Sequence, residues 1–180
     1  MLTNKPDIIA ELRKRFLEAS KEVNRLPIGG LPFRKIETYD YDDNGMEFRI
    51  HRLKKRSING QKIPGIWEIV ELKGNSNYEP HIHDRTDATF HIMAGSGVIV
   101  IGNDYRHYNT GSDYDAPKGR PHGYITNEPT VFLSVQDRPI KDPATGELDF
   151  RRIENPWRPP RWAMEQHLRN QKNAKAAATA

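Results

Sequence analysis

Short runs of alternating hydrophobic and polar residues fill the middle of the chain. The clearest are "RKIETYDY" at 34–41, "MEFRIHRL" at 46–53, "GIWEIVELK" at 65–73 and "GVIVIG" at 97–102. Runs rich in β-branched and aromatic residues predict strands. We expect further strands at 88–93, 105–108, 111–116, 121–126 and 130–136. Turn-forming stretches separate these runs, and no helical pattern lies between them. The sequence therefore predicts an all-β antiparallel sandwich or barrel.

The two ends of the chain have helical patterns instead. Near the N-terminus, Ile9, Leu12 and Phe16 recur at three- and four-residue steps, which predicts a helix with one apolar face. Near the C-terminus, an arm rich in Arg, Trp and Pro leads into a second predicted helix. We therefore expect an N-terminal helix and connection at 1–30, a β-barrel at 31–140, and a C-terminal arm and helix at 141–180.

Composition narrows the class of protein. The 180 residues are 36% hydrophobic and 29% charged, which is typical of one globular domain with a sizeable core. No apolar run approaches the 18 residues of a membrane-spanning helix, and the first residues lack the apolar segment of a signal peptide. The chain has no cysteine, which excludes disulfides, thiolate metal ligands and a cysteine nucleophile. We expect a cytoplasmic protein without membrane contact.

The charge pattern gives little support to nucleic-acid binding. Net charge is only +4, and much of the excess lies near the C-terminus, at Arg151, Arg152, Arg158, Arg161, Arg169, Lys172 and Lys175. Nucleic-acid binding usually needs a basic surface on a recognisable module. The stretch "NPWRPPRW" is rich in proline, so we interpret it as an extended arm that packs on the barrel or on a partner subunit.

Three histidines have the spacing of metal ligands. Residues i and i+2 of a strand share one face, so the imidazoles of His81 and His83 can share an ion. A third histidine, His122, follows Pro117 and Gly119. A proline and a glycine at this spacing predict a tight turn, which would direct His122 toward the same point.

These two stretches resemble the paired motifs of the cupin superfamily. The first reads His-x-His, four residues, Ala88, six residues, Gly; the second reads Gly, five residues, Pro-x-Gly, two residues, His, with Asn127 one residue late. The resemblance covers about residues 65–138. It implies a small antiparallel β-barrel of the jelly-roll type with a divalent metal at its centre. It does not fix the reaction, because one fold supports many activities.

The glutamate of the first cupin motif is replaced by Ala88. Asp87 fits a shorter form of the motif, whereas His91 would face the opposite side of a regular strand. We therefore expect the ligands to be His81, His83 and His122 alone. Three neutral ligands leave the full charge of the ion uncompensated, which favours an anionic or chelating substrate. Histidine ligands suit Fe, Zn and Ni, and we place Fe(II) first.

The resemblance favours a metal-dependent enzyme that acts on a small polar or anionic organic molecule. We place a dioxygenase first, since some thiol dioxygenases that resemble cupins hold Fe(II) with three histidines. The first alternative is a Lewis-acid isomerase or lyase, with Tyr78 or Tyr124 as acid or base. The second is a non-catalytic cupin that binds a small ligand, an alternative favoured by the absent glutamate.

Three further residues are candidates for substrate contact. Arg85 lies beside the predicted ligands, Phe90 fits either core packing or substrate contact, and Gln136 lies near the end of the last strand. Gln136 can also orient a ligand imidazole. Cupins often dimerise through edge strands, and terminal arms commonly exchange between subunits, so we expect a homodimer.

Overall fold

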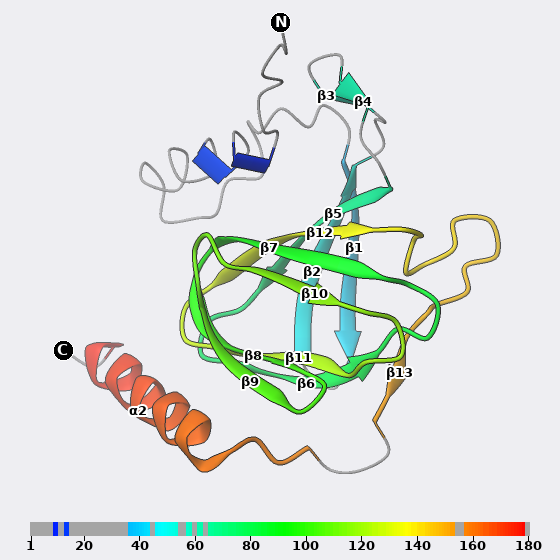
Figure 1. Cartoon of the computed structure of the whole chain (residues 1–180). Helices are drawn as coiled ribbons and strands as arrows, with labels where there is room; N and C mark the ends of the chain where they lie inside the picture. Colours follow the sequence, from blue (N-terminus) through cyan, green and yellow to red (C-terminus); the bar gives the residue numbers. More distant parts are fainter. Residues whose placement is uncertain are drawn as a thin grey trace, which may run out of the picture.

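A barrel of two antiparallel β-sheets forms the body of the protein (Figure 1). The computed structural model describes residues 9–10, 13–14, 36–43, 46–53, 57–58, 61–62, 65–153 and 157–178. The predicted N-terminal helix lies mostly outside this range, and its four described residues are helical. The all-β barrel expected from the sequence is confirmed.

The larger sheet has six strands among the described residues. Their order is β1 (Ile36–Asp43), β2 (Met46–Leu53), β5 (Ile66–Leu72), β12 (Thr130–Gln136), β7 (Ala88–Ala94) and β10 (Asp113–Ala116). Each neighbouring pair is antiparallel. A separate short hairpin pairs β3 (Ser57–Ile58) with β4 (Gln61–Lys62).

The second sheet has five described strands and carries the histidines. Their order is β13 (Arg151–Arg152), β6 (Asn77–Ile82), β11 (His122–Thr126), β8 (Ser96–Ile101) and β9 (Asp104–Asn109). No alternating run marks β6, which contains Pro80, and the pair of histidines is its main signal. The two-residue strand β13 falls within the predicted arm and is too short for any periodic pattern.

Aromatic side chains from both sheets meet in the barrel interior. Phe90 and Phe132 of the larger sheet have ring centroids 5.1 Å apart. Phe132 also stacks on Tyr124 of the second sheet, at 5.1 Å and an interplanar angle of 19°. All three rings are buried. Burial of each large apolar side chain contributes about 1.5–3 kcal/mol, so these contacts hold the sheets together around the site.

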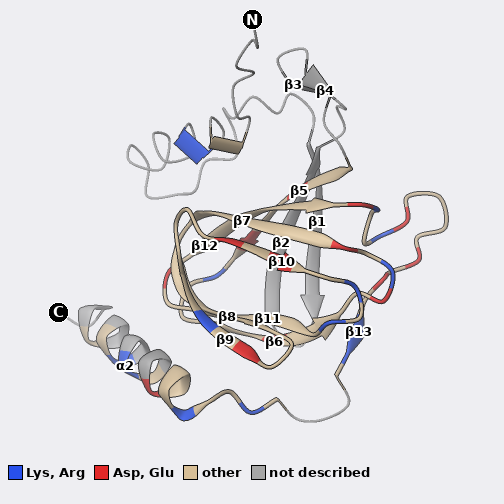
Figure 2. Cartoon of the chain, viewed as in Figure 1, with Lys and Arg blue, Asp and Glu red and all other residues tan. Residues whose placement is uncertain are grey.

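The C-terminal helix α2 (Arg161–Ala178) lies beside the barrel (Figure 1). It packs through Ala163 on Val98 and Ile125. Just before it, the Trp157 indole donates a hydrogen bond of 2.7 Å to the Tyr105 hydroxyl. Figure 2 shows basic residues along the arm and this helix. The described part of the chain contains no helix with the length and apolarity needed to cross a membrane.

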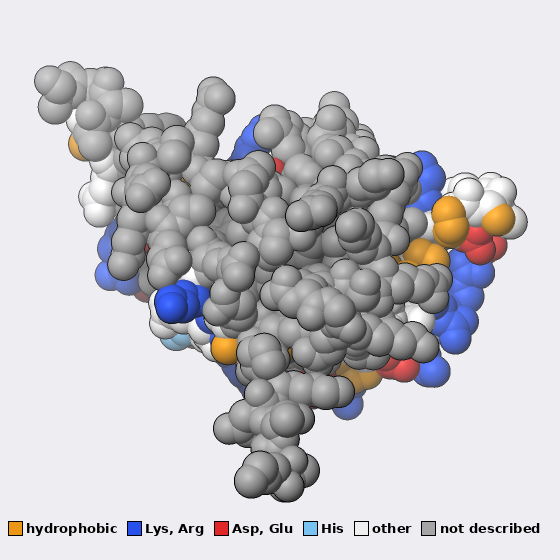
Figure 3. Space-filling view, turned by 90° about the horizontal axis from the view of Figure 1, so that it is seen from above, with side chains coloured by type: hydrophobic (Ala, Val, Ile, Leu, Met, Phe, Trp, Pro, Cys, Tyr) orange, Lys and Arg blue, Asp and Glu red, His pale blue; other side chains and the backbone are white. Residues whose placement is uncertain are grey.

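The described residues on the surface seen in Figure 3 carry side chains of several types. In the view from above, basic, acidic and hydrophobic side chains lie next to one another along the rim (Figure 3).

Candidate metal centre and its cavity

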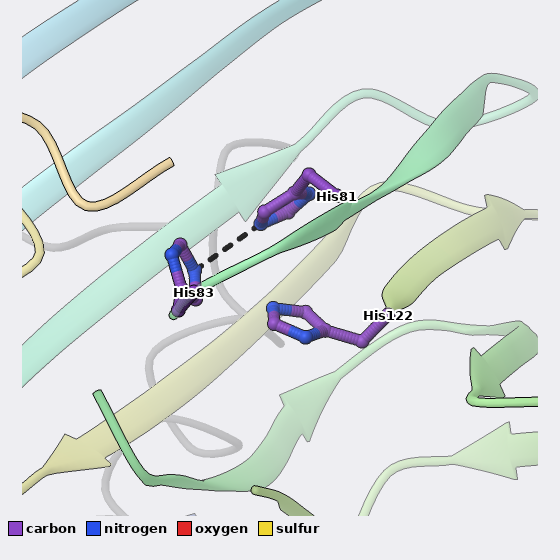
Figure 4. Close-up of side chains that lie close together, drawn as sticks. All are labelled: His81, His83 and His122. Atoms are coloured by element: carbon purple, nitrogen blue, oxygen red, sulfur yellow. Dashed lines mark hydrogen bonds between the residues drawn. The ribbon is translucent and has the colours of Figure 1, made fainter. Parts of the chain in front are cut away.

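Strands β6 and β11 bring the three histidines together. His81 belongs to β6, His83 follows this strand directly, and His122 begins β11. The strands are paired, with His122 opposite His81. The Nε2 atoms of His81 and His83 are 3.3 Å apart, and one ring nitrogen from each of the three residues lies within 4.8 Å of the others. Figure 4 shows the imidazoles converging on one point.

Two glycines allow this approach. A Cβ atom on Gly123 would lie 2.6 Å from the Tyr78 carbonyl oxygen, so only glycine lets β11 approach β6 this closely. Gly119 has a φ of 74° and forms the turn before His122. Its N–H donates a hydrogen bond of 2.7 Å to the His83 carbonyl. The turn of the second motif is therefore anchored on a histidine of the first.

All three imidazoles are held neutral. Burial is the main cause: it lowers the pKa of His122 to about 3, with a further contribution from neighbouring His83. Burial also lowers the pKa of His81 well below its usual value, with contributions from the other two histidines. The pKa of His83 is likewise lowered by burial. Neutral imidazoles have the lone pairs that metal ions require.

Backbone carbonyls orient two of the rings. The Nδ1 of His83 donates to the carbonyl oxygen of Asp149, and the Nδ1 of His122 donates over 3.2 Å to that of Arg120. These bonds place the proton on Nδ1 and leave Nε2 as the acceptor. The Nε2 of His122 is buried and has no hydrogen-bond partner among the described residues. An unpaired buried acceptor beside two neutral imidazoles fits a divalent metal ion.

Asp149 and Phe150 complete the site from the C-terminal segment. The buried Asp149 carboxylate accepts hydrogen bonds from the backbone N–H groups of Asp84 and Arg85 and from the Thr86 hydroxyl, at 2.9, 3.1 and 2.7 Å. Burial acts to raise the pKa of Asp149, but these hydrogen bonds outweigh it and lower the pKa overall. The carboxylate thus fixes the loop that follows His83.

Phe150 covers His81. The two rings stack with centroids 4.6 Å apart and an interplanar angle of 22°. The next residues, β13, pair with β6. Sequence reasoning assigned Asp149 and Phe150 to the linker and arm, and no local pattern connects them with histidines more than 60 positions earlier.

A cavity of about 80 Å³ lies between the two sheets beside the histidines. Its hydrophobic lining includes Val70, Leu72, Phe90, Phe132, Leu148 and Phe150. The larger sheet contributes polar groups to the lining. Glu68 of β5 is paired directly with Ser134 of β12, and Gln136 lies two residues further along β12. Glu68 was missed by sequence reasoning, because a glutamate in an alternating strand looks like an ordinary surface residue.

Four of the predicted site residues also line the cavity: Tyr78, Phe90, Tyr124 and Gln136. The Tyr78 hydroxyl accepts a hydrogen bond of 2.8 Å from the Lys73 N–H. The Tyr124 hydroxyl is buried and has no hydrogen-bond partner in the part of the chain that the structure describes. The Gln136 amide donates to Glu68 Oε2 and to Ser134 Oγ, each over 2.9 Å, so its contacts are with the cavity wall and not with an imidazole.

The other candidates lie apart from the histidine cluster. Arg85 forms an ion pair of 3.0 Å with Glu147 and is not among the residues that line the cavity. Asp87 accepts a hydrogen bond of 2.9 Å from the Lys118 N–H. His91 contacts Asp113 at 2.9 Å. In the part of the chain that the structure describes, the cluster with metal-ligand geometry contains His81, His83 and His122 alone.

Solved structures with similar folds include barrel proteins of several kinds. KdgF from Halomonas sp. has 17% identity and a TM-score of 0.45, over 56% of this chain and 85% of that chain. Streptomyces Pac13, described as a nucleoside dehydratase, has 12% identity and a TM-score of 0.42, over 57% and 78%.

An uncharacterised Klebsiella pneumoniae protein with a double-stranded β-helix domain has 22% identity and a TM-score of 0.40, over 50% of this chain and 70% of that chain. No protein-family profile matches the sequence, and a search of curated proteins finds no match.

Proposed function

We propose that this protein is a metal-dependent enzyme that acts on a small organic molecule, with His81, His83 and His122 as metal ligands. The observation that carries the proposal is the convergence of three neutral imidazoles at one cavity. Burial without a metal would leave the His122 Nε2 unpaired, which costs free energy.

The reaction that we place first is a dioxygenation. Bound Fe(II) would activate O₂, and the substrate would supply the electrons as both oxygen atoms are added to it. The hydrophobic cavity excludes water, which protects such a reaction from competing hydrolysis or proton leakage. Phe90 and Phe132 offer aromatic faces to the substrate, and the segment with Phe150 covers the histidine side of the cavity.

A Lewis-acid isomerase or lyase is the second candidate. It is favoured by the hydroxyl groups of Tyr78 and Tyr124, two residues that line the cavity. Such groups can hold or transfer a proton at a bound substrate. The two candidates differ in their requirement for O₂ and in their preferred metal.

We also propose that the chain forms a homodimer. Trp162 and Leu168 of α2 are 41% and 50% exposed. A second copy packed on α2 would remove this hydrophobic surface from water.

The decisive experiment is metal analysis by elemental mass spectrometry on protein purified without chelator or nickel affinity resin. Wild type would be compared with a His81→Ala/His122→Ala double variant and with His91→Ala as the matched control. We expect about one metal ion per chain in wild type and in the control, and loss of the ion in the double variant.

The identity of the bound metal distinguishes the two candidate reactions. Iron would support the dioxygenase and lead to substrate screens by O₂ uptake, whereas zinc or nickel would support Lewis-acid chemistry. Wild type without stoichiometric metal would contradict the proposal and would favour the non-catalytic, ligand-binding alternative.

A further inference from the structure

The cavity has two layers along the barrel. On the larger sheet, Glu68 of β5 pairs with Ser134 of β12, and two residues further along β5 Val70 pairs with Phe132. Side chains two residues apart on a strand point to the same face, and all four of these residues line the cavity. The first layer of this wall is therefore polar and the second is hydrophobic.

The smaller sheet faces the two layers with different residues. His122 and Tyr124 lie two residues apart on β11. The His122 ring faces the first layer, where its centroid is 5.3 Å from that of Phe90, and Phe90 pairs with Ser134. Tyr124 faces the second layer, with its ring centroid 5.1 Å from that of Phe132. Phe132 and Tyr124 thus belong to the hydrophobic layer, one step beyond the histidines.

Aromatic contacts fix the hydrophobic layer. Phe132 packs edge-on against Phe90, at 5.1 Å and an interplanar angle of 61°, and stacks on Tyr124. Tyr124 in turn packs against Tyr108, at 5.9 Å and 83°. All four side chains are at most 5% exposed. In a close-packed interior these rings cannot move aside without losing their contacts, so the fold fixes the dimensions of the cavity.

The volume of the cavity limits what it can hold. It is about 80 Å³, whereas an apolar protein cavity that binds benzene has about 150 Å³. A cavity of half that volume is too small for an aromatic ring and large enough for a short aliphatic group. Transfer of such a group from water to the hydrophobic side chains of Val70, Leu72 and Phe132 is favourable.

We propose that Phe132 is a specificity-determining residue, which limits the part of the substrate bound between the sheets to a short aliphatic group smaller than a benzene ring. Substrates that would place an aromatic ring here are excluded. The proposal rests on the proposed function in that it takes this cavity as the substrate site. It adds the size and the apolar character of the group that enters.

The test is an NMR titration of the full-length, metal-free protein, kept in excess chelator, with xenon and with benzene. Both probes are uncharged and apolar and lack the donor atoms of a metal ligand, so they differ chiefly in size. Binding would be followed through the backbone amide shifts of Val70 on the larger sheet and of Gly123 and Tyr124 on the smaller sheet. A probe inside the cavity shifts signals from both sheets.

We expect xenon to shift these signals in wild type and benzene to leave them unchanged. Phe132→Ala removes the ring that occupies the hydrophobic layer, so this variant should bind benzene at least about tenfold more tightly than wild type. The matched control is Leu133→Ala. Leu133 is the next residue of β12, is 1% exposed, points to the opposite face of the sheet and is not among the residues that line the cavity. In this control benzene should not shift signals from both sheets.

A second variant guards against failure of Phe132→Ala to fold. Val70→Phe places a larger side chain in the hydrophobic layer and should abolish the xenon shifts. Benzene binding to wild type, the absence of xenon shifts in wild type, xenon binding unchanged in Val70→Phe, or a folded Phe132→Ala variant that excludes benzene would each overturn the proposal. The probes and variants do not involve the histidines, so the result is independent of whether the metal proposal holds.

Discussion

At the residue scale, Ala88 occupies the position that a glutamate holds in the first cupin motif. Ala88 is buried on β7, and its neighbour across the sheet is Gln136 on β12. Gln136 in turn bonds to Glu68 on β5. The Glu68 carboxylate therefore lies in the cavity lining two strands away from Ala88. It does not belong to the histidine cluster. The histidine cluster and the acidic group therefore lie on different sheets.

Asp149 gives a prediction at the same scale. Asp149→Ala removes the acceptor for three donors of the loop after His83. We expect the free energy of unfolding to fall by about 2–3 kcal/mol, measured by urea denaturation. We also expect metal affinity to fall about 10–100-fold, as is typical when a group that orients a ligand is lost.

The matched control is Asp142→Ala. Asp142 is a partly exposed carboxylate that accepts backbone hydrogen bonds from Ala144 and Thr145 in the same C-terminal segment. Unlike Asp149, it accepts no hydrogen bond from the loop after His83 among the described residues, and it acts on that loop only through electrostatic attraction to Arg85. Equal loss of metal affinity in both variants would show that Asp149 has no specific role at the metal centre.

At the element scale, the C-terminal segment has two separable parts. Phe150 stacks on His81, and Arg151 and Arg152 pair with β6. Trp157 and α2 instead pack on the outside of the barrel. The first part completes the site, and the second part is remote from it.

Two truncations test this division. A chain that ends at residue 156 should fold and bind metal with the wild-type stoichiometry. A chain that ends at residue 147 lacks Asp149, Phe150 and β13, so it should bind metal at least about tenfold more weakly and unfold at a lower temperature. The measurements are metal titration and thermal unfolding. Unchanged metal binding by the shorter chain would contradict a role for this segment in the site.

At the scale of the whole molecule, metal binding should stabilise the fold. A ligand at 100 times its dissociation constant stabilises the folded state by about 2.7 kcal/mol. For a chain of this length, that corresponds to a rise in Tm of about 5–10 °C. Differential scanning fluorimetry with and without chelator measures the shift. The His81→Ala/His122→Ala variant should show none, and an equal shift there would locate metal binding elsewhere.

The proposed homodimer is also a property of the whole molecule. Light scattering should give twice the mass of one chain for wild type. Trp162→Glu combined with Leu168→Glu should give monomers, since both side chains are large, exposed and hydrophobic. Lys172→Glu, a charge change on the same helix, is the control. A monomeric wild type would refute the dimer.

Local patterns in the sequence predicted the strands of the barrel and the three histidines. Alternation with a period of two marks a strand wherever it lies, and the His-x-His and Pro-x-Gly-x-x-His spacings need only a strand and a turn to direct their side chains. β7, β8, β9, β11 and β12 lie within one residue of their predicted ranges, whereas β10 begins two residues later. Strand positions and the spacing of the histidines depend on residues close together in the sequence, so they can be predicted from the sequence alone.

Only the tertiary structure places Glu68, Asp149 and Phe150 at the site. Asp149 contacts a loop more than 60 residues earlier, and Glu68 bonds to Gln136 across 68 positions. Such contacts depend on the order in which strands pair and on their register, and no short stretch of sequence specifies either. The grouping of the three histidines was therefore predictable from local spacing, whereas the groups that orient them and the wall that faces them were decided by the fold.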